Sequence, residues 1–169
     1  DINTKAYLLV NAVNTAMFAV LLHRFARKSS AFAPLAAGLI TVSVVAILYY
    51  FPLMVFASTI LTQWVNVDFA TSSTPLVRIM ALASLIYLYG NVFENALNAM
   101  GRARLVLRVY LVAITAYGVA VSFTIWMDAL IGFMYSYLTL CVVLGIGFVF
   151  QYWKVNRGSI STGVKNGTT

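Results

Sequence analysis

Charged side chains are scarce in this sequence. Only 9% of its 169 residues are charged, 62% are hydrophobic, and the mean hydropathy is +0.92. Because soluble domains carry roughly 25% charged residues, this scarcity excludes a water-soluble globular protein. The charges that remain are mostly basic, 11 Lys and Arg against 4 Asp and Glu. In so apolar a chain, a basic excess is typical of loops beside a membrane and not of a nucleic-acid-binding surface.

Residues that build covalent or metal-bound sites are almost missing. The one cysteine, Cys141, excludes a disulfide framework or a cysteine-based metal site within one chain. The one histidine, His23, excludes a two-histidine haem or zinc site in the same way. A Ser/His/Asp set, paired carboxylates within the membrane and a glycine-rich phosphate loop are also lacking. We therefore expect no enzyme activity, no cofactor and no metal.

Long charge-free runs are abundant. A helix that crosses a bilayer needs about 20 mainly apolar residues. The runs predict an all-α polytopic membrane protein in which residues 1–153 form a bundle of five transmembrane helices, over about 6–25, 33–61, 75–100, 105–127 and 129–153. Pro52 should kink the second helix, and Pro75 should lie in the first turn of the third. Residues 154–169, rich in Gly, Ser and Thr, are predicted to be a disordered cytoplasmic tail.

Basic residues segregate to one side of this five-helix arrangement. Nine Lys and Arg fall on one side and only Lys5 and Arg78 on the other, which by the positive-inside rule places the N-terminus outside and the C-terminus in the cytoplasm. An odd number of helices with an external N-terminus and no signal segment indicates that an upstream part is missing. We therefore expect this chain to be a fragment of a longer protein.

Polar residues follow one face of two predicted helices. On the third helix they are Tyr87, Asn91, Glu94, Asn95, Asn98 and Arg102, and on the first they are Tyr7, Asn11, Asn14 and Thr15. Polar side chains are costly against lipid, so both stripes should face the bundle interior or a water-filled cavity. Two interpretations stay open, because the stripes could form hydrogen bonds between helices or line a cavity.

Glu94 is the one carboxylate well inside a predicted span. It is therefore a candidate for cation coupling or substrate binding, but it could equally form a structural ion pair with Arg102 or Arg108. Together with Arg104, these two arginines flank the turn between the third and fourth helices. Their guanidinium groups could hold a phosphate or pyrophosphate, or could serve as ordinary positive-inside anchors.

Several segments resemble the C-terminal half of bacterial polysaccharide flippases, in the multidrug, oligosaccharidyl-lipid and polysaccharide exporter superfamily. They are Trp64 with the polar loop to Phe69, residues 75–83 (PLVRIMALA), residues 98–105 (NAMGRARL) and the basic residues 23–28 (HRFARK). The shared pattern is an external loop with Trp, a helix that opens with Pro and a basic residue, and a small-residue-Gly-Arg turn. The resemblance implies the last five helices of a twelve-helix, two-lobe transporter.

The resemblance also implies a function. The protein would move a polyprenyl-pyrophosphate-linked oligosaccharide across the bacterial inner membrane for surface polysaccharide assembly, such as O-antigen of lipopolysaccharide. Asn11, Asn14, Asn91, Asn95 and Asn98 would contact sugar, Arg102 and Arg108 would bind the pyrophosphate, and Glu94 would gate or couple to a proton or sodium ion. Its partners would be this substrate, membrane lipids and that ion. Two alternatives are a structural or assembly subunit of a membrane complex and a multidrug exporter of the same superfamily.

Overall fold

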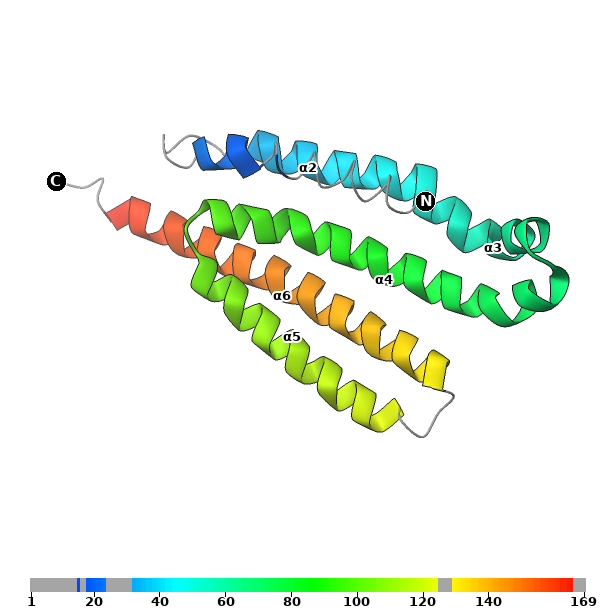
Figure 1. Cartoon of the computed structure of the whole chain (residues 1–169). Coiled ribbons are helices and arrows are strands. Elements are labelled where there is room, and N and C mark those ends of the chain that lie inside the picture. The colour runs from blue at the N-terminus through cyan, green and yellow to red at the C-terminus, as the bar shows by residue number, and fades with distance from the viewer. Residues whose placement is uncertain (1–14, 16–17, 24–31, 125–128, 166–169) are drawn as a thin grey trace.

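The structure, a computed structural model, describes residue 15 and residues 18–23, 32–124 and 129–165. The described part is almost entirely helical (Figure 1), which confirms the predicted all-α class. Its elements are α2 (Phe32–Val45), the π-helix η1 (Ala46–Tyr50), α3 (Phe51–Trp64), α4 (Val67–Ala99), α5 (Ala103–Thr124) and α6 (Ala129–Lys165).

Four of the helical stretches are long and apolar enough to cross a membrane. They are Ala33–Trp64, Val67–Ala99, Ala103–Thr124 and Leu130–Arg157. Large apolar side chains also cover the outside of these helices, and Leu48 and Phe123 are 73% and 78% exposed. Such a surface is expected where lipid is the solvent, so the chain is a polytopic helical membrane protein. The predicted first span lies mostly outside the described residues, apart from residues 18–23, and stays a prediction.

Helix α4 is the centre of the arrangement. It packs against α2 and α3 on one side and against α6 on the other, and α5 packs mainly against α6 (Figure 1). With 33 residues, α4 is about 50 Å long. This length exceeds a hydrocarbon core of roughly 30 Å, so α4 is long enough to span it even when tilted.

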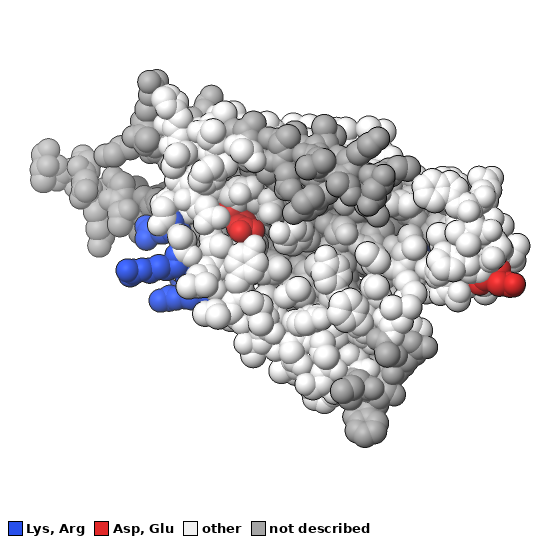
Figure 2. Space-filling view, viewed as in Figure 1, with Lys and Arg blue, Asp and Glu red and all other residues white. Residues whose placement is uncertain are grey.

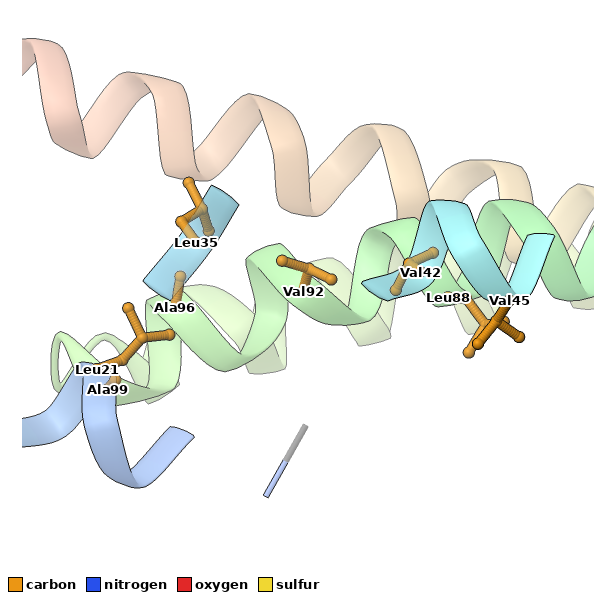
Figure 3. Close-up of a cluster of buried hydrophobic side chains, with 8 residues drawn as sticks. All are labelled: Leu21, Leu35, Val42, Val45, Leu88, Val92, Ala96 and Ala99. Atoms are coloured by element: carbon orange, nitrogen blue, oxygen red, sulfur yellow. The ribbon is translucent and has the colours of Figure 1, made fainter. Parts of the chain in front are cut away.

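One apolar cluster joins α2 to α4 (Figure 3). Leu35, near the start of α2, lies beside Ala96, near the end of α4, whereas Val42 and Val45 lie near Leu88. The two helices therefore run antiparallel. Leu21 lies beside Ala99 in the same cluster, so residues 18–23 approach the end of α4 that leads into the 100–102 turn. The basic residues 24–28 lie outside the described residues, so the prediction that they share a side with that turn stays a prediction.

A second cluster joins α4, α5 and α6 around the fully buried Phe148 and Leu97. Close packing of α4 and α6 depends on two glycines. A Cβ atom on Gly90 would lie 2.9 Å from the Cα atom of Gly145, and a Cβ atom on Gly145 would lie 2.9 Å from the Ile86 Cγ2 atom. Small residues let helix backbones approach closely in a membrane, where lipid is as apolar as the side chains.

The predicted distortion at Pro52 is present as a π-helix. Pro52 has no N–H, so the Leu48 carbonyl loses its usual helical partner. The preceding five residues, Ala46–Tyr50, adopt the wider π geometry, and the Phe51 N–H donates to the Ala46 carbonyl five residues back. The helix axis changes direction between α2 and α3 (Figure 1).

The third predicted helix begins earlier than expected. It starts at Val67, and Pro75 lies inside it, not in its first turn. The physical reason is the cap at Asn66, whose Oδ1 atom accepts the Phe69 N–H at 2.8 Å, while Asp68 lies in the first turn. An Asn cap followed by an acidic residue satisfies free N–H groups and complements the helix dipole. These local terms outweigh the missing N–H of Pro75.

The last helix ends later than expected. Helix α6 continues to Lys165, through most of the segment predicted to be a tail. Residues 154–165 contain no proline, so the backbone hydrogen bonds of a long apolar helix can propagate into them. The Arg157 guanidinium also lies 3.7 Å from the centre of the Trp153 ring, one turn back. Residues 166–169 lie outside the described part.

Candidate functional site

Helix α4 carries the predicted polar face toward its C-terminal end. Tyr87, Asn91, Glu94, Asn95 and Asn98 are all half-buried, and they alternate with fully buried Val92, Ala96 and Leu97. At about 100° per residue, the first set follows one side of the helix over roughly 16 Å. These five residues are called the α4 polar face. The structure therefore brings together the four site residues that the sequence predicted on this helix.

Glu94 of the α4 polar face forms a hydrogen bond to α5 through its carboxylate. The Tyr110 hydroxyl of α5 donates to the Glu94 Oε2 atom at 2.9 Å. The Tyr110 ring packs edge-on against Phe148 of α6, with 5.5 Å between the ring centres. Tyr87 also interacts with Tyr110. Tyr110 thus contacts Glu94 of α4 through its hydroxyl and Phe148 of α6 through its ring.

Two asparagines of the α4 polar face bind each other. The Asn95 Nδ2 atom donates to the Asn91 Oδ1 atom at 2.9 Å, one helical turn away. This pairing uses one donor and one acceptor of the two amides. Asn91 has a further interaction beside this pair. A carboxamide offers two donors and an acceptor oxygen, and this chemistry matches that of hydroxyl groups.

The turn after α4 has the geometry that its sequence predicts. Gly101 has φ of 71°, its N–H donates to the Asn98 carbonyl at 2.9 Å, and the Arg102 N–H donates to the Leu97 carbonyl at 3.0 Å. This pattern is a Schellman motif, which requires a residue with positive φ and favours glycine. The motif places Arg102 directly beside the end of the α4 polar face.

Basic side chains gather at this end of the molecule (Figure 2). The exposed basic residues here are Arg102, Arg104, Arg108, Lys154 and Arg157. In the same view, acidic atoms lie at two places, at the α3–α4 end and on the face near the basic end. The two acidic residues that the structure describes are Asp68 and Glu94. This basic end is the one that the charge count places in the cytoplasm.

The structural ion pair between Glu94 and Arg102 or Arg108 is not formed among the described residues. The carboxylate is bound by Tyr110 instead, and both arginines are exposed. Arg108 precedes Tyr110 by two residues, which places the two side chains about 200° apart around α5. Arg108 therefore lies on the far side of α5 from the α4 polar face, and the structure does not bring it to Glu94.

Two predicted site residues, Asn11 and Asn14, lie outside the described residues. Their predicted roles stay predictions. Conversely, two contacts were not expected from the sequence: the bond from Tyr110 to Glu94, and the bond between α2 and α4 in which the hydroxyl groups of Ser43 and Tyr89 lie 2.8 Å apart. A tyrosine within a charge-free run is the signal that could have pointed to each of these contacts. To choose the partner of each tyrosine, one must also know which helices are neighbours.

The chemistry of the α4 polar face is that of binding. It offers amides, phenols and one carboxylate, and such groups form hydrogen bonds with hydroxyls and can hold a cation or a proton. Within the described ranges, no group of three His, Cys, Asp or Glu residues is placed to hold a metal ion. A buried nucleophile paired with a base does not appear among the contacts of this face.

No family model, curated protein or solved structure matches this chain.

Proposed function

We propose that this chain is part of a membrane transporter whose α4 polar face lines the path of a lipid-linked oligosaccharide. In this proposal the protein moves a polyprenyl-pyrophosphate-linked sugar unit from the cytoplasmic to the outer leaflet of a bacterial inner membrane. The chain would supply the last five helices of a twelve-helix, two-lobe transporter that works by alternating access.

The observation that carries the proposal is the α4 polar face itself. Five half-buried polar residues follow one side of a helix whose buried core residues are apolar. A polar side chain within a bilayer is costly unless it faces protein or water, and such residues commonly mark a substrate or ion pathway. The resemblance of residues 75–83 and 98–105 to polysaccharide flippases supports the choice of substrate.

Each group has a role in this mechanism. Amides of Asn91, Asn95 and Asn98 bind sugar hydroxyls by donating and accepting hydrogen bonds. Arg102, which follows the face at the basic end, binds the pyrophosphate by a charge-assisted contact. Glu94 changes its contact with Tyr110 when it takes up a proton or a sodium ion, and this change biases the equilibrium between the two access states. Arg108 lies elsewhere, as described above, and has no role in this step.

The main alternative is a structural or assembly subunit. One observation favours it: among the residues that the structure describes, no buried side-chain nitrogen or oxygen atom lacks a hydrogen-bond partner. Helix-to-helix bonds such as Tyr110 to Glu94 and Ser43 to Tyr89 would then serve only to hold the bundle together.

A flipping measurement separates the two functions. The purified protein is reconstituted into liposomes, and flipping of a fluorescent polyprenyl-pyrophosphate oligosaccharide is followed by its exposure to an impermeant quencher. For Asn95→Ala we expect normal folded yield and flipping reduced roughly tenfold, the effect of losing one to two hydrogen bonds to substrate. Met80→Ala, on the exposed apolar side of the same helix, is the matched control and should flip normally.

The alternative function predicts a different outcome. If the asparagines only join helices, Asn95→Ala lowers the folded yield, and the wild-type protein gives no more flipping than protein-free liposomes. That result would refute the proposed function.

A further inference from the structure

A groove between α5 and α6 lies away from the α4 polar face. It has a volume of about 150 Å³ and is lined by Arg108, Val109, Val112, Val143, Gly147, Phe150 and Gln151. It faces outward, because Val112 and Phe150 are 61% and 56% exposed. On α5 it occupies the side that carries Arg108, about 200° from Tyr110. The groove is therefore separate from the contact between Glu94 and Tyr110.

Gly147 is part of the groove lining and lets α5 approach α6 closely. Val109 of α5 packs directly onto Gly147 of α6, so closely that a Cβ atom on the glycine would lie 2.7 Å from Val109 Cγ1. On α6, Val143 and Phe150 lie about one turn before and after Gly147 and line the groove with it. Most of the lining residues are apolar, which suits a methylene chain.

The polarity of the groove changes along the helix axes. Arg108 and Gln151 are its two strongly polar residues, and both lie toward the basic end of their helices. Val112 on α5 and Val143 on α6 lie one and two turns deeper, toward the middle of the bilayer. A ligand that fills the groove therefore needs an anionic or polar group at the interface and an apolar chain that extends inward.

Charge at the mouth favours an anion. Arg104 precedes Arg108 by one turn and Lys154 follows Gln151 by three residues, so both lie on the groove side of their helices, and both are exposed. Glu94 is the described acidic residue nearest in sequence, and its carboxylate is bound to Tyr110 on the opposite side of α5. An arginine fork matches the oxygen atoms of a phosphate group.

We propose that this groove is a binding site for one anionic glycerophospholipid of the leaflet at the basic end. The phosphate is held by Arg108 and Gln151, and the first part of one acyl chain lies against Val112, Val143, Gly147 and Phe150. The lipid bridges α5 and α6, so its binding stabilises their packing. This proposal does not depend on the transported substrate, because the groove and the α4 polar face share no residue.

The test compares thermal unfolding of the purified protein in detergent with added phosphatidylglycerol or phosphatidylcholine. We expect a saturable rise in the melting temperature with phosphatidylglycerol, and a smaller one with phosphatidylcholine. Arg108→Gln should raise the half-saturating phosphatidylglycerol concentration roughly tenfold, the effect of losing a charged hydrogen bond. Arg157 is exposed at the same end of the molecule but does not line the groove. Arg157→Gln should therefore leave the half-saturating concentration unchanged.

A second pair of variants tests the shape of the groove. Val112→Trp should fill the groove and abolish the phosphatidylglycerol effect, whereas Leu111→Trp, on an equally exposed neighbour outside the lining, should preserve it. Equal losses in Arg108→Gln and Arg157→Gln would show diffuse charge attraction and overturn the proposal. Equal stabilisation of the wild type by both lipids would also overturn it.

A measurement on the wild-type protein tests the lipid site even if the variants fail to fold. Phosphatidylglycerol with a photoreactive group on its acyl chain is cross-linked to the protein in liposomes, and the labelled peptides are mapped. Labelling concentrated in residues 108–112 and 143–151 supports the site. Labelling confined to other segments would show that the lipid does not occupy the groove. Displacement of the lipid by polyprenyl pyrophosphate, at concentrations below that of the lipid, would assign the groove to the substrate. Either result would overturn the proposal.

Discussion

The Glu94 carboxylate shows how one acidic residue is accommodated in an apolar bundle. It lies about 8 Å from the end of α4, it is half-buried, and the Tyr110 hydroxyl donates to it at 2.9 Å. A hydrogen bond to a charged group contributes about 1.5–3 kcal/mol, and a charged group that loses its partner loses at least as much. The position of Tyr110 is in turn set by its ring contact with Phe148.

Removing the Tyr110 hydroxyl should therefore destabilise the protein. For Tyr110→Phe we expect a loss of about 1.5–3 kcal/mol in the free energy of unfolding, measured by denaturant titration in detergent. Tyr117→Phe, a similar change elsewhere on α5, is the control and should cost less than about 0.5 kcal/mol. In the background of Glu94→Gln, Tyr110→Phe should cost clearly less, because the bond then involves no charge. Equal costs in the two backgrounds would show that Glu94 and Tyr110 do not interact.

Replacing Glu94 by glutamine distinguishes a role in ion coupling from a role in holding the helices together. The amide oxygen of glutamine can still accept from Tyr110, so Glu94→Gln should keep a normal folded yield. It cannot take up a proton or bind a sodium ion by charge, so the dependence of flipping on a proton or sodium gradient should disappear. Flipping in liposomes with and without each gradient is the measurement. A normal yield with an unchanged gradient response would leave Glu94 without a coupling role.

At the scale of helices, glycine contacts decide how closely α4 and α6 pack. Gly90 and Gly145 face each other with no room for a side chain, since an added Cβ atom would come within 2.9 Å of a neighbouring atom at either position. The neighbour of Gly90 is backbone, which cannot rotate away. The two helices would have to separate to accept any larger residue.

Substitution at this contact should be costly. For Gly90→Val we expect a loss of about 1–3 kcal/mol or more in the free energy of unfolding, because overpacking forces backbone shifts. Gly118→Ala on α5 is the matched control, because a Cβ atom added there would meet no other atom within 4 Å. Alanine in an open helix position should be neutral or stabilising by about 0.5–1 kcal/mol. Similar melting temperatures for the two variants would contradict the packing of α4 on α6.

Helix ends can be predicted from the sequence where a local motif decides them. The turn at Gly101 is predictable because Gly and arginines follow a long apolar run, and the Schellman hydrogen bonds confirm it. The predicted start of α4 is wrong, because the Asn66 cap outweighs the effect of Pro75. Partners across helices could not be predicted, because the bond from Tyr110 to Glu94 depends on the rotation and spacing of two helices. Periodicity could place the α4 polar face, but not what it contacts.

For the whole molecule, the segregation of basic residues to one end predicts the orientation in the membrane. Arg102 and Arg104 lie at the α4–α5 turn, whereas Asp68 lies at the opposite end of α4. By the positive-inside rule, we expect the basic end to lie in the cytoplasm. Composition could predict the membrane class, and the positions of Lys and Arg between the apolar runs could predict this segregation. It could not show that α6 lies between α4 and α5, since that order depends on the glycine contacts.

Sidedness can be measured with single cysteines in a Cys141→Ala background. Ala103→Cys, in the basic turn, should react with an impermeant maleimide only in inside-out vesicles. Val65→Cys, in the exposed turn between α3 and α4, should react only in intact cells whose outer face is accessible. Reaction of both from the same side would be incompatible with α4 as a transmembrane helix, and the reverse pattern would contradict the orientation.

The central claim is that the α4 polar face lines an aqueous path. The most direct measurement is the reaction of Asn95→Cys, in an active protein lacking Cys141, with an impermeant thiosulfonate that reacts with thiols in water. Val92→Cys, on the fully buried side of the same helix, and Ala103→Cys, in the exposed turn, give the lower and upper limits of the rate. We predict a rate for Asn95→Cys well above that of Val92→Cys, and slower reaction when the lipid-linked oligosaccharide is bound. A rate as low as that of Val92→Cys throughout the transport cycle, while Ala103→Cys reacts, would contradict the claim.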